Sequence, residues 1–182
     1  KKEKKNDIIS FFNTAKEYCI SKGYEWEINS KRDISFENIK SEDFLWKYIF
    51  VVISSGMKNQ VAEKIFNKFR NTRNLNDIGH EGKRKAIATA MEKYSDWFSE
   101  LQKSEDKLTF LETLPFIKKI TKYHLARNLG FDVCKPDRHL RTLAERFGYD
   151  DVQKMCKEIS DKTGERIGVI DAILWRYSNL TS

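Results

Sequence analysis

Glycine and proline are scarce in this chain of 182 residues, which contains 8 glycines and 2 prolines. A many-stranded sheet needs many turns, and these two residues mark turns more strongly than any others. Their shortage therefore favours helices. Apolar residues make up 40% of the sequence, enough for a real core. The length suits one domain, or two small lobes that share a core.

Cysteine is also rare, and the three cysteines, Cys19, Cys134 and Cys156, form no CxxC pair. This spacing argues against a four-thiolate zinc site or iron–sulfur cluster, and reduced thiols in a cytoplasmic protein are expected. Long apolar runs are missing too, because Lys47 interrupts the longest one, "FLWKYIFVVI". We expect no membrane span, no signal peptide and a monomeric protein.

Acidic residues are outnumbered, with 27 Asp and Glu against 34 Lys and Arg, for a formal net charge of +7. Such a balance weakly favours a polyanionic partner, of which double-stranded DNA is one. A helical protein–protein adaptor with incidental charge is the alternative. Salt-dependent DNA binding separates the two interpretations.

Helical patterns cover most of the chain. Asp7 is placed to cap a first helix that ends at Gly23, and residues 24–40 are expected to be irregular or briefly extended. Ser41 is expected to cap a nearly all-apolar helix that Gly56 ends. The fold class predicted is all-α. The remaining predicted helices cover 58–71, 83–103, 106–114, 120–129, 138–147, 151–160 and 165–178.

Residues 107–129 contain a candidate helix-hairpin-helix. The segment "LETLPFIKKITKYHLARNLG" reads as two helices joined by a short turn. Exposed N–H groups at the start of the second helix are suited to cradle a phosphate. Lys118, Lys119 and Lys122 add positive charge there. An ordinary helical hairpin with a solvated lysine face fits the spacing equally well.

Asp137 lies in "DVCKPDRHL", directly after a proline and among the basic residues Arg138, His139 and Arg141. A carboxylate repels DNA, so a protein that only binds DNA gains little from it. Helix capping alone would explain the residue. A carboxylate at a helix N-terminus also stays ionised. Beside a sugar whose C1′ becomes oxocarbenium-like, it would stabilise the cation and orient or deprotonate water.

The order of hairpin, short loop and helix-opening aspartate resembles the helix-hairpin-helix DNA glycosylase superfamily. "LPFIK" and "PDRHL" carry the likeness, and "VISSGMKNQVAEKIFNKF" and "IGHEGKRKAI" extend it to roughly residues 44 to 147. The resemblance implies a two-lobed helical fold with a central cleft and Asp137 at its mouth. Lobe one would be about 42–128, and lobe two would combine about 6–40 with 131–182.

The resemblance also implies roles for single residues. Asp137 matches the catalytic aspartate, and His139 matches a histidine that touches a DNA phosphate. Hairpin amides would bind phosphate, and a monovalent cation on hairpin carbonyls is the one cofactor considered. Phe116 and Lys118 stand where the superfamily has glycines. The implied DNA contacts are Phe116, Ile117, Lys118, Lys119, Thr121, Lys122, Arg138, His139 and Arg141.

Bifunctional members of the superfamily form a Schiff base through a lysine just before the hairpin threonine. Thr121 matches that threonine, which leaves Ile120 at the lysine position. An isoleucine cannot attack C1′, so the resemblance implies a monofunctional hydrolase of the 3-methyladenine type, with alkylated purines as the default substrate. A base-excision repair role, excision of a phage-modified base in defence, and a non-catalytic DNA-binding module all remain open.

A glycosylase flips its target nucleotide out of the helix and fills the gap. Met57 is placed to act as the wedge, although a methionine packed between helices fits equally. Tyr24, Trp26 and Trp46 offer stacking faces for the base, and core packing is the alternative for each. His124 either faces the cleft or lies on the helix surface.

Overall fold

The computed structural model describes residues 7–182, which form helices and connecting loops with no strand among them. The all-α fold class predicted from the sequence is confirmed. The chain divides into two compact units. The continuous unit is Phe36–Leu129, and the discontinuous unit combines the N-terminal segment up to Ser35 with Gly130–Ser182.

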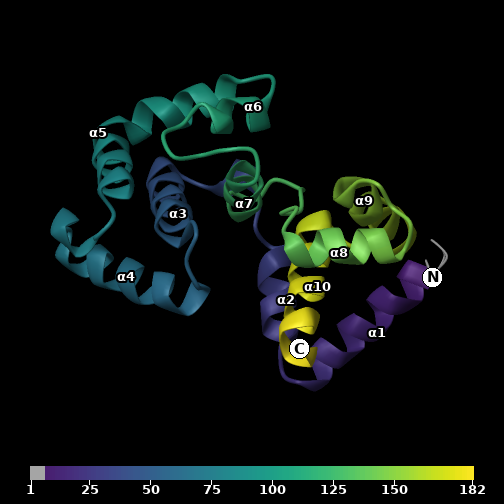
Figure 1. Cartoon of the computed structure of the whole chain (residues 1–182). Coiled ribbons are helices and arrows are strands. Elements are labelled where there is room, and N and C mark those ends of the chain that lie inside the picture. Colours follow the sequence, from purple (N-terminus) through teal and green to yellow (C-terminus); the bar gives the residue numbers. More distant parts are fainter. Residues whose placement is uncertain (1–6) are drawn as a thin grey trace. The chain divides into compact units, whose positions relative to one another are not determined.

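The continuous unit is built around one apolar helix, α3 (Ser41–Ser54), which packs against α4, α5 and α7. Its buried side chains include Phe44, Tyr48 and Ile49, as expected for a helix without a polar face. Figure 1 shows α4 and α5 following it along the chain. The other elements are η1 (Phe36–Asn38), α4 (Asn59–Thr72), η2 (Leu75–Asp77), α5 (Glu81–Lys103), α6 (Lys107–Glu112) and α7 (Thr121–Asn128).

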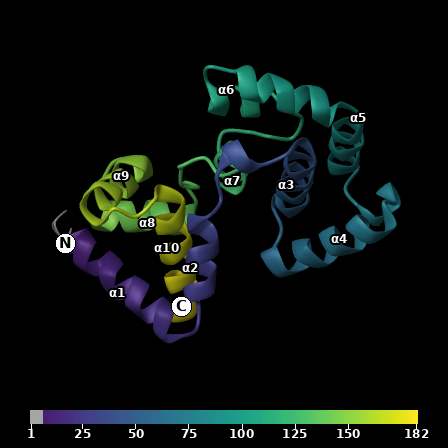
Figure 2. The same cartoon turned by 180° about the vertical axis from the view of Figure 1, so that it is seen from behind.

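The discontinuous unit is centred on α10 (Ile167–Thr181), which contacts every other helix of the unit. Both views show α10, in yellow, between helices from the two ends of the chain (Figures 1 and 2). The core therefore joins segments more than 100 residues apart, for example Phe12 with Phe147 and Ile170. The other helices are α1 (Asp7–Ser21), α2 (Glu25–Arg32), α8 (Arg138–Arg146) and α9 (Val152–Thr163).

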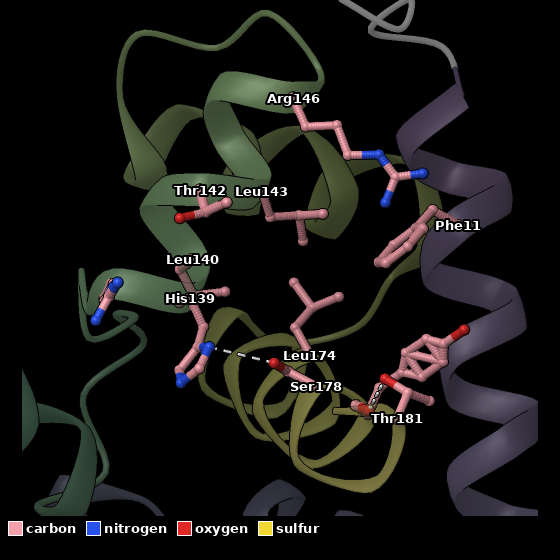
Figure 3. Close-up of a pocket in the computed structure, with 11 residues that line it drawn as sticks. Phe11, His139, Leu140, Thr142, Leu143, Arg146, Leu174, Ser178 and Thr181 are labelled. Carbon is pink, nitrogen blue, oxygen red and sulfur yellow. Dashed lines mark hydrogen bonds between the residues drawn. The ribbon is translucent and has the colours of Figure 1, made fainter.

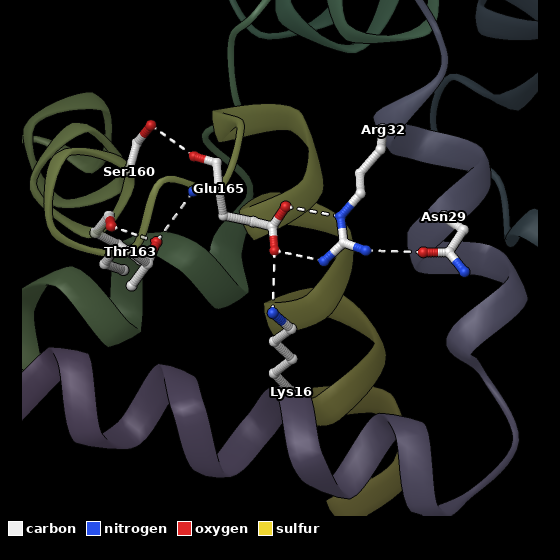
Figure 4. A network of polar contacts seen from close by, with 7 residues as sticks. Lys16, Asn29, Arg32, Ser160, Thr163 and Glu165 are labelled. Carbon is white, nitrogen blue, oxygen red and sulfur yellow. Dashed lines mark hydrogen bonds and ion pairs between the residues drawn. The ribbon is translucent and has the colours of Figure 1, made fainter.

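Glu165 ties three segments of the discontinuous unit together (Figure 4). Its carboxylate accepts hydrogen bonds from Arg32 at 2.7 and 2.9 Å and from Lys16 at 3.2 Å. The Arg32 hydrogen bonds, more than the Lys16 contact, hold the pKa of Glu165 below its ordinary value against the opposing effect of burial. The charge of Glu165 thus contributes to stability at neutral pH.

One stretch differs from its predicted structure. Residues 24–40 were expected to be irregular, yet they contain α2 and η1. Helix α2 is polar and buries only Ile28, so the sequence carries no strong helical pattern there. Contacts made by Glu27 with Arg176 and by Arg32 with Glu165 hold the helix in place. Tertiary contacts have overridden a weak local preference.

The start of α3 also differs in detail. Ser41 was expected to precede the helix as its cap, but α3 begins at Ser41 and Lys40 is the N-cap residue. The Lys40 N–H donates to the Asp43 carboxylate at 2.8 Å. An acid in the first turn thus performs the capping that was assigned to the serine hydroxyl.

All three cysteines are buried and free. The pKa of the Cys156 thiol is raised well above its ordinary value, first by its hydrogen bond with Cys134 and then by burial. Among residues 7–182, no cluster of three or more His, Cys, Asp or Glu side chains is arranged to hold a metal ion. No helix in this part of the chain combines the length and apolarity needed to cross a bilayer.

Candidate functional site

Asp137 is the N-cap residue of α8, with extended backbone angles of φ −79° and ψ 177°. Its Oδ1 accepts the Leu140 N–H at 3.0 Å, so the capping role considered from the sequence is present. The other oxygen, Oδ2, accepts no hydrogen bond from residues 7–182. One carboxylate oxygen is therefore fixed by the helix, and the second remains available to a ligand.

The segment that leads into Asp137 is anchored at two of its peptide groups, one after Gly130 and one between Cys134 and Lys135. Arg166 Nη2 donates to the Gly130 carbonyl at 2.9 Å. Gln153 Nε2 donates to the Cys134 carbonyl at 3.0 Å. The Lys135 N–H donates to Asp171 Oδ2 at 2.6 Å. The backbone before Asp137 is thus held by side chains from α9 and α10 rather than by regular secondary structure.

A pocket of about 360 Å³ lies beside α8 within the discontinuous unit (Figure 3). Arg138 and His139 line it, and the His139 ring is 3.2 Å from the Ser178 hydroxyl of α10. Arg146 also lines it, while no acidic side chain does. Positive charge and hydroxyl groups over an apolar floor suit an anion such as a phosphate. The remaining lining residues are Phe11, Leu140, Thr142, Leu143, Leu174, Tyr177 and Thr181.

The hairpin between α6 and α7 keeps a left-handed backbone at Phe116, where φ is 69°. Glycine adopts this region freely, and a phenylalanine there costs on the order of 1 kcal/mol. The Phe116 ring packs edge-on against the His80 ring, with centroids 5.7 Å apart. A side chain at Gly82 would meet the Phe116 ring at 3.3 Å. Ring packing thus supports a turn that glycine would form without strain.

The start of α7 offers backbone donors. The Lys118 N–H is used, because it donates to the Thr121 hydroxyl at 3.0 Å. The N–H groups of Lys119, Ile120 and Thr121 find no acceptor within the described part of the chain. Lys118 and Lys119 are exposed beside them. Three open amides and two ammonium groups make a suitable phosphate-binding turn.

Two other hairpin groups are engaged in holding the turn. Lys122 bridges the two helices by an ion pair of 2.9 Å with Glu112. This hydrogen bond is the main reason that the pKa of Lys122 is raised. The Pro115 carbonyl accepts the Tyr48 hydroxyl at 2.5 Å. Lys122 is therefore less suited to bind phosphate than Lys118 or Lys119.

Ile120 is the N-cap residue of α7 and is 45% exposed, which is unusual for an isoleucine. It borders an open depression of about 560 Å³ together with Ile117, Lys118 and Lys119. The position that the superfamily resemblance assigns to a lysine thus presents an apolar side chain to solvent.

Two of the proposed base-contacting residues in the continuous unit pack within it. The Trp46 ring contacts Phe66 and Phe69, and the Arg73 guanidinium stacks on it at 4.4 Å. The His124 ring lies 6.3 Å from the Phe50 ring. The contacts of Trp46 fit the core-packing interpretation rather than base stacking, because other side chains already pack against several sides of its ring.

Met57 is half-buried in the turn between α3 and α4. Lys83 braces this turn, because its Nζ donates to the carbonyls of Ile53 and Ser55, each at 2.7 Å. Burial lowers the pKa of Lys83. The Met57 side chain therefore lies on a supported turn.

Tyr24 and Trp26 belong to the discontinuous unit and differ in exposure. The Arg176 guanidinium stacks on the Tyr24 ring at 4.3 Å and is held by Glu27 at 2.7 Å. Trp26 is 67% exposed, the most exposed large apolar side chain of the described residues. Trp26 is thus open to a stacking partner, whereas one face of Tyr24 is already covered.

The structure divides the predicted site residues between the two units. The hairpin residues, Met57, Trp46 and His124 belong to the continuous unit, and Asp137, Arg138, His139, Arg141, Tyr24 and Trp26 belong to the discontinuous unit. Sequence reasoning missed Asp171 and Gln153, which anchor the segment before Asp137. The signal that could have identified Asp171 is a lone acid within the apolar stretch "GVIDAILW".

No protein-family model matches the chain, and no curated protein sequence matches it. Solved structures do match. The structure of the Methanocaldococcus jannaschii 8-oxoguanine glycosylase/lyase in complex with a 15mer DNA containing 8-oxoguanine aligns with a TM-score of 0.74, at 18% identity, over 94% of this chain and 98% of that chain. The 8-oxoguanine DNA glycosylase of Thermotoga maritima aligns with a TM-score of 0.69, at 15% identity, over 94% and 95%. The chain thus has the fold of these proteins. Neither match supports the 3-methyladenine subtype expected from the sequence.

Proposed function

We propose that this protein is a DNA glycosylase that hydrolyses the N-glycosidic bond of a modified base and leaves an abasic site. The observation that carries the proposal is Asp137, an N-cap aspartate with one open oxygen, in a chain of which 94% matches the fold of two DNA glycosylases. For DNA binding alone, a carboxylate among Arg138, His139 and Arg141 is unfavourable because it repels the phosphates, and an uncharged N-cap residue would cap α8 equally well.

Asp137 supplies the chemistry. The α8 N-terminus stabilises its negative charge, and Oδ1 is held by the Leu140 N–H. As the bond between C1′ and the base breaks, the sugar gains positive charge, and the open oxygen stabilises it. The electron pair of the broken bond leaves with the base. Water then adds to C1′, and its proton passes to the departed base, directly or through the Asp137 carboxylate.

Two basic elements are proposed to bind the DNA backbone. In the hairpin, the open amides of Lys119, Ile120 and Thr121 bind a phosphate, with Lys118 and Lys119 adding charge. On α8, Arg138 and His139 line the positively charged pocket. These contacts give salt-dependent affinity and no sequence preference.

The absence of a lyase step is part of the proposal. A lyase needs an amine that attacks C1′, and Ile120 has none. Lys122 is held by Glu112, which keeps its ammonium charged and engaged. The Methanocaldococcus jannaschii protein is a glycosylase/lyase, so this chain would share its fold but release the base by hydrolysis, without the lyase step.

Base release from defined duplexes tests the proposal. The first duplex carries 8-oxoguanine, because the names of both matched proteins give it as their substrate. The other duplexes carry methylated, deaminated and phage-type modified bases. Hot alkali converts abasic sites into strand breaks. We expect breaks only after alkali, and at least about a 1,000-fold slower reaction for Asp137→Asn.

The asparagine variant separates chemistry from capping. Asparagine caps helices as well as aspartate does, so the stability of Asp137→Asn should stay within about 0.5 kcal/mol of the original. DNA binding should be kept or strengthened, because a negative charge is removed. Equal rates for the two proteins would exclude Asp137 as the catalytic group, and tight binding without release from any duplex would favour a non-catalytic module.

A further inference from the structure

Asp171 is the only acidic side chain among residues 7–182 that is buried, with no exposed surface. It lies in α10, between Ile170 and Ala172, where the helix is otherwise apolar. Burial of a carboxylate is costly, and replacing a buried ionic group by an apolar one is often neutral or stabilising. Stability of the core alone therefore gives no reason for an acid at this position.

The Asp171 carboxylate reaches the backbone just before Asp137. Its Oδ2 accepts the Lys135 N–H at 2.6 Å, a short hydrogen bond typical of a charged acceptor. The carbonyl of Lys135 in turn accepts the Asp137 N–H at 2.8 Å. A single residue thus links the two acids, and Pro136 between them restricts the backbone further.

A second anchor acts on the other side of the same peptide group. Gln153 Nε2 donates to the Cys134 carbonyl at 3.0 Å, so α9 holds residue 134 and α10 holds residue 135. Asp137 is then fixed on its other side by the Leu140 N–H. The chain is therefore held by hydrogen bonds both before and after Asp137, which is the arrangement needed for a preorganised catalytic group.

We propose that Asp171 is a positioning residue that holds the Lys135 peptide group and thereby sets the location of the Asp137 carboxylate. The proposal rests on the proposed function, because Asp137 matters most if it performs the chemistry. Gln153 assists by holding the carbonyl of this same peptide group. A displacement of about 1 Å at a catalytic group is enough to cost about 100-fold in rate.

Single-turnover base release, DNA affinity and hydrogen exchange of the Lys135 amide together test Asp171. Asp171→Leu removes the acceptor and should slow base release about 10- to 100-fold, with DNA affinity changed less than about threefold. Its Lys135 amide should lose protection. Asp171→Asn keeps an acceptor oxygen and should rescue most of the rate and the protection. Gln153→Ala should give a smaller loss of rate in a folded protein.

Glu165→Gln is the matched control, because Glu165 is a mostly buried acid of the same unit that does not contact the segment before Asp137. It should lower stability while leaving base release and Lys135 protection unchanged. Two results would overturn the proposal. One is a folded Asp171→Leu protein with the original rate. The other is an Asp171→Asn protein that loses base release while its Lys135 amide stays protected, because the charge of Asp171 would then matter in some way other than by holding this peptide group.

The exchange measurement keeps the two proposals apart. If the original protein releases no base from any duplex, the proposed function fails, yet the Lys135 amide still reports whether Asp171 holds this segment. If Asp171→Leu does not fold, Asp171→Asn and Gln153→Ala carry the test. Unchanged Lys135 protection and rate in Gln153→Ala, together with an inactive but protected Asp171→Asn, would again refute positioning.

Discussion

Ile120 determines, at the scale of one residue, whether the proposed site can form a covalent intermediate. Its side chain is 45% exposed at the N-cap of α7, so a longer polar side chain fits there without repacking the core. Because position 120 is exposed, a lysine can be introduced there with little effect on the stability of the fold. The chemistry at this position is therefore open to a gain-of-function test.

Ile120→Lys should introduce lyase activity. An amine at this position would attack C1′, displace the base and form a Schiff base that borohydride traps as a protein–DNA adduct. We expect adduct formation at least roughly tenfold above the original protein, with some strand breaks before alkali. Val61→Lys is the matched control, because Val61 is an equally exposed apolar residue of the same unit, at 47%. Equal trapping by both lysine variants would show that position 120 does not face the sugar.

At the scale of one element, the hairpin turn combines strain with open donors. Phe116 has a left-handed backbone, and the Lys118 N–H is taken by Thr121. The donors left for a phosphate are the amides that follow, with the ammonium groups of Lys118 and Lys119 beside them. The glycines expected from the superfamily are replaced here by a packed ring and by added charge.

Replacing both Lys118 and Lys119 by glutamine should lower the salt dependence of DNA binding. Each phosphate contact contributes about 0.9 to the slope of log K against log salt, so the slope should fall by about 1 to 2. The control is the Lys157→Gln, Lys162→Gln double variant, which removes the same charge from α9, where each lysine pairs with an acid. A slope that falls equally in both double variants would mean that only net charge matters.

At the scale of the whole molecule, the chain returns to its N-terminal helices to complete the discontinuous unit. Helices α1 and α2 pack on α10, which follows them by more than 130 residues. Glu165 joins Lys16 and Arg32 across this closure. The charge of one carboxylate is thus linked to the stability of the unit that carries Asp137.

Stability of this unit should fall in acid. The pKa of Glu165 is lowered in the folded state, chiefly by the Arg32 hydrogen bonds. Its contribution, on the order of 1 kcal/mol, is present above the unfolded-state pKa of about 4.3 and is lost as pH falls through the lower folded-state value. Urea unfolding should therefore show Glu165→Gln less stable at neutral pH and equal to the original near pH 3. Asp161→Asn, an exposed pair partner, should show little difference at either pH.

Much of the fold followed from the sequence, because the helices that form the core carry their own apolar periodicity. Helix α3 is apolar nearly throughout, and glycines at positions 56, 130 and 148 adopt positive φ where helices were expected to end. Asp137 was identifiable as a helix N-cap residue, since an aspartate after proline and before a helical pattern is a local signal for the start of a helix. Helix α2 was missed because its stability comes from Glu27 and Arg32 contacts with distant segments.

The sequence by itself determined the helical class, the hairpin, the isoleucine that precedes Thr121 and the aspartate that opens α8. Each of these depends on residues within one or two helical turns. Only the tertiary structure decided that Trp46 is packed, that Lys122 is bound to Glu112 and that Asp171 holds the Lys135 peptide. Those outcomes depend on partners brought together by the fold, up to 36 residues away along the chain in the case of Asp171. A local pattern carries no information about which partner a side chain meets.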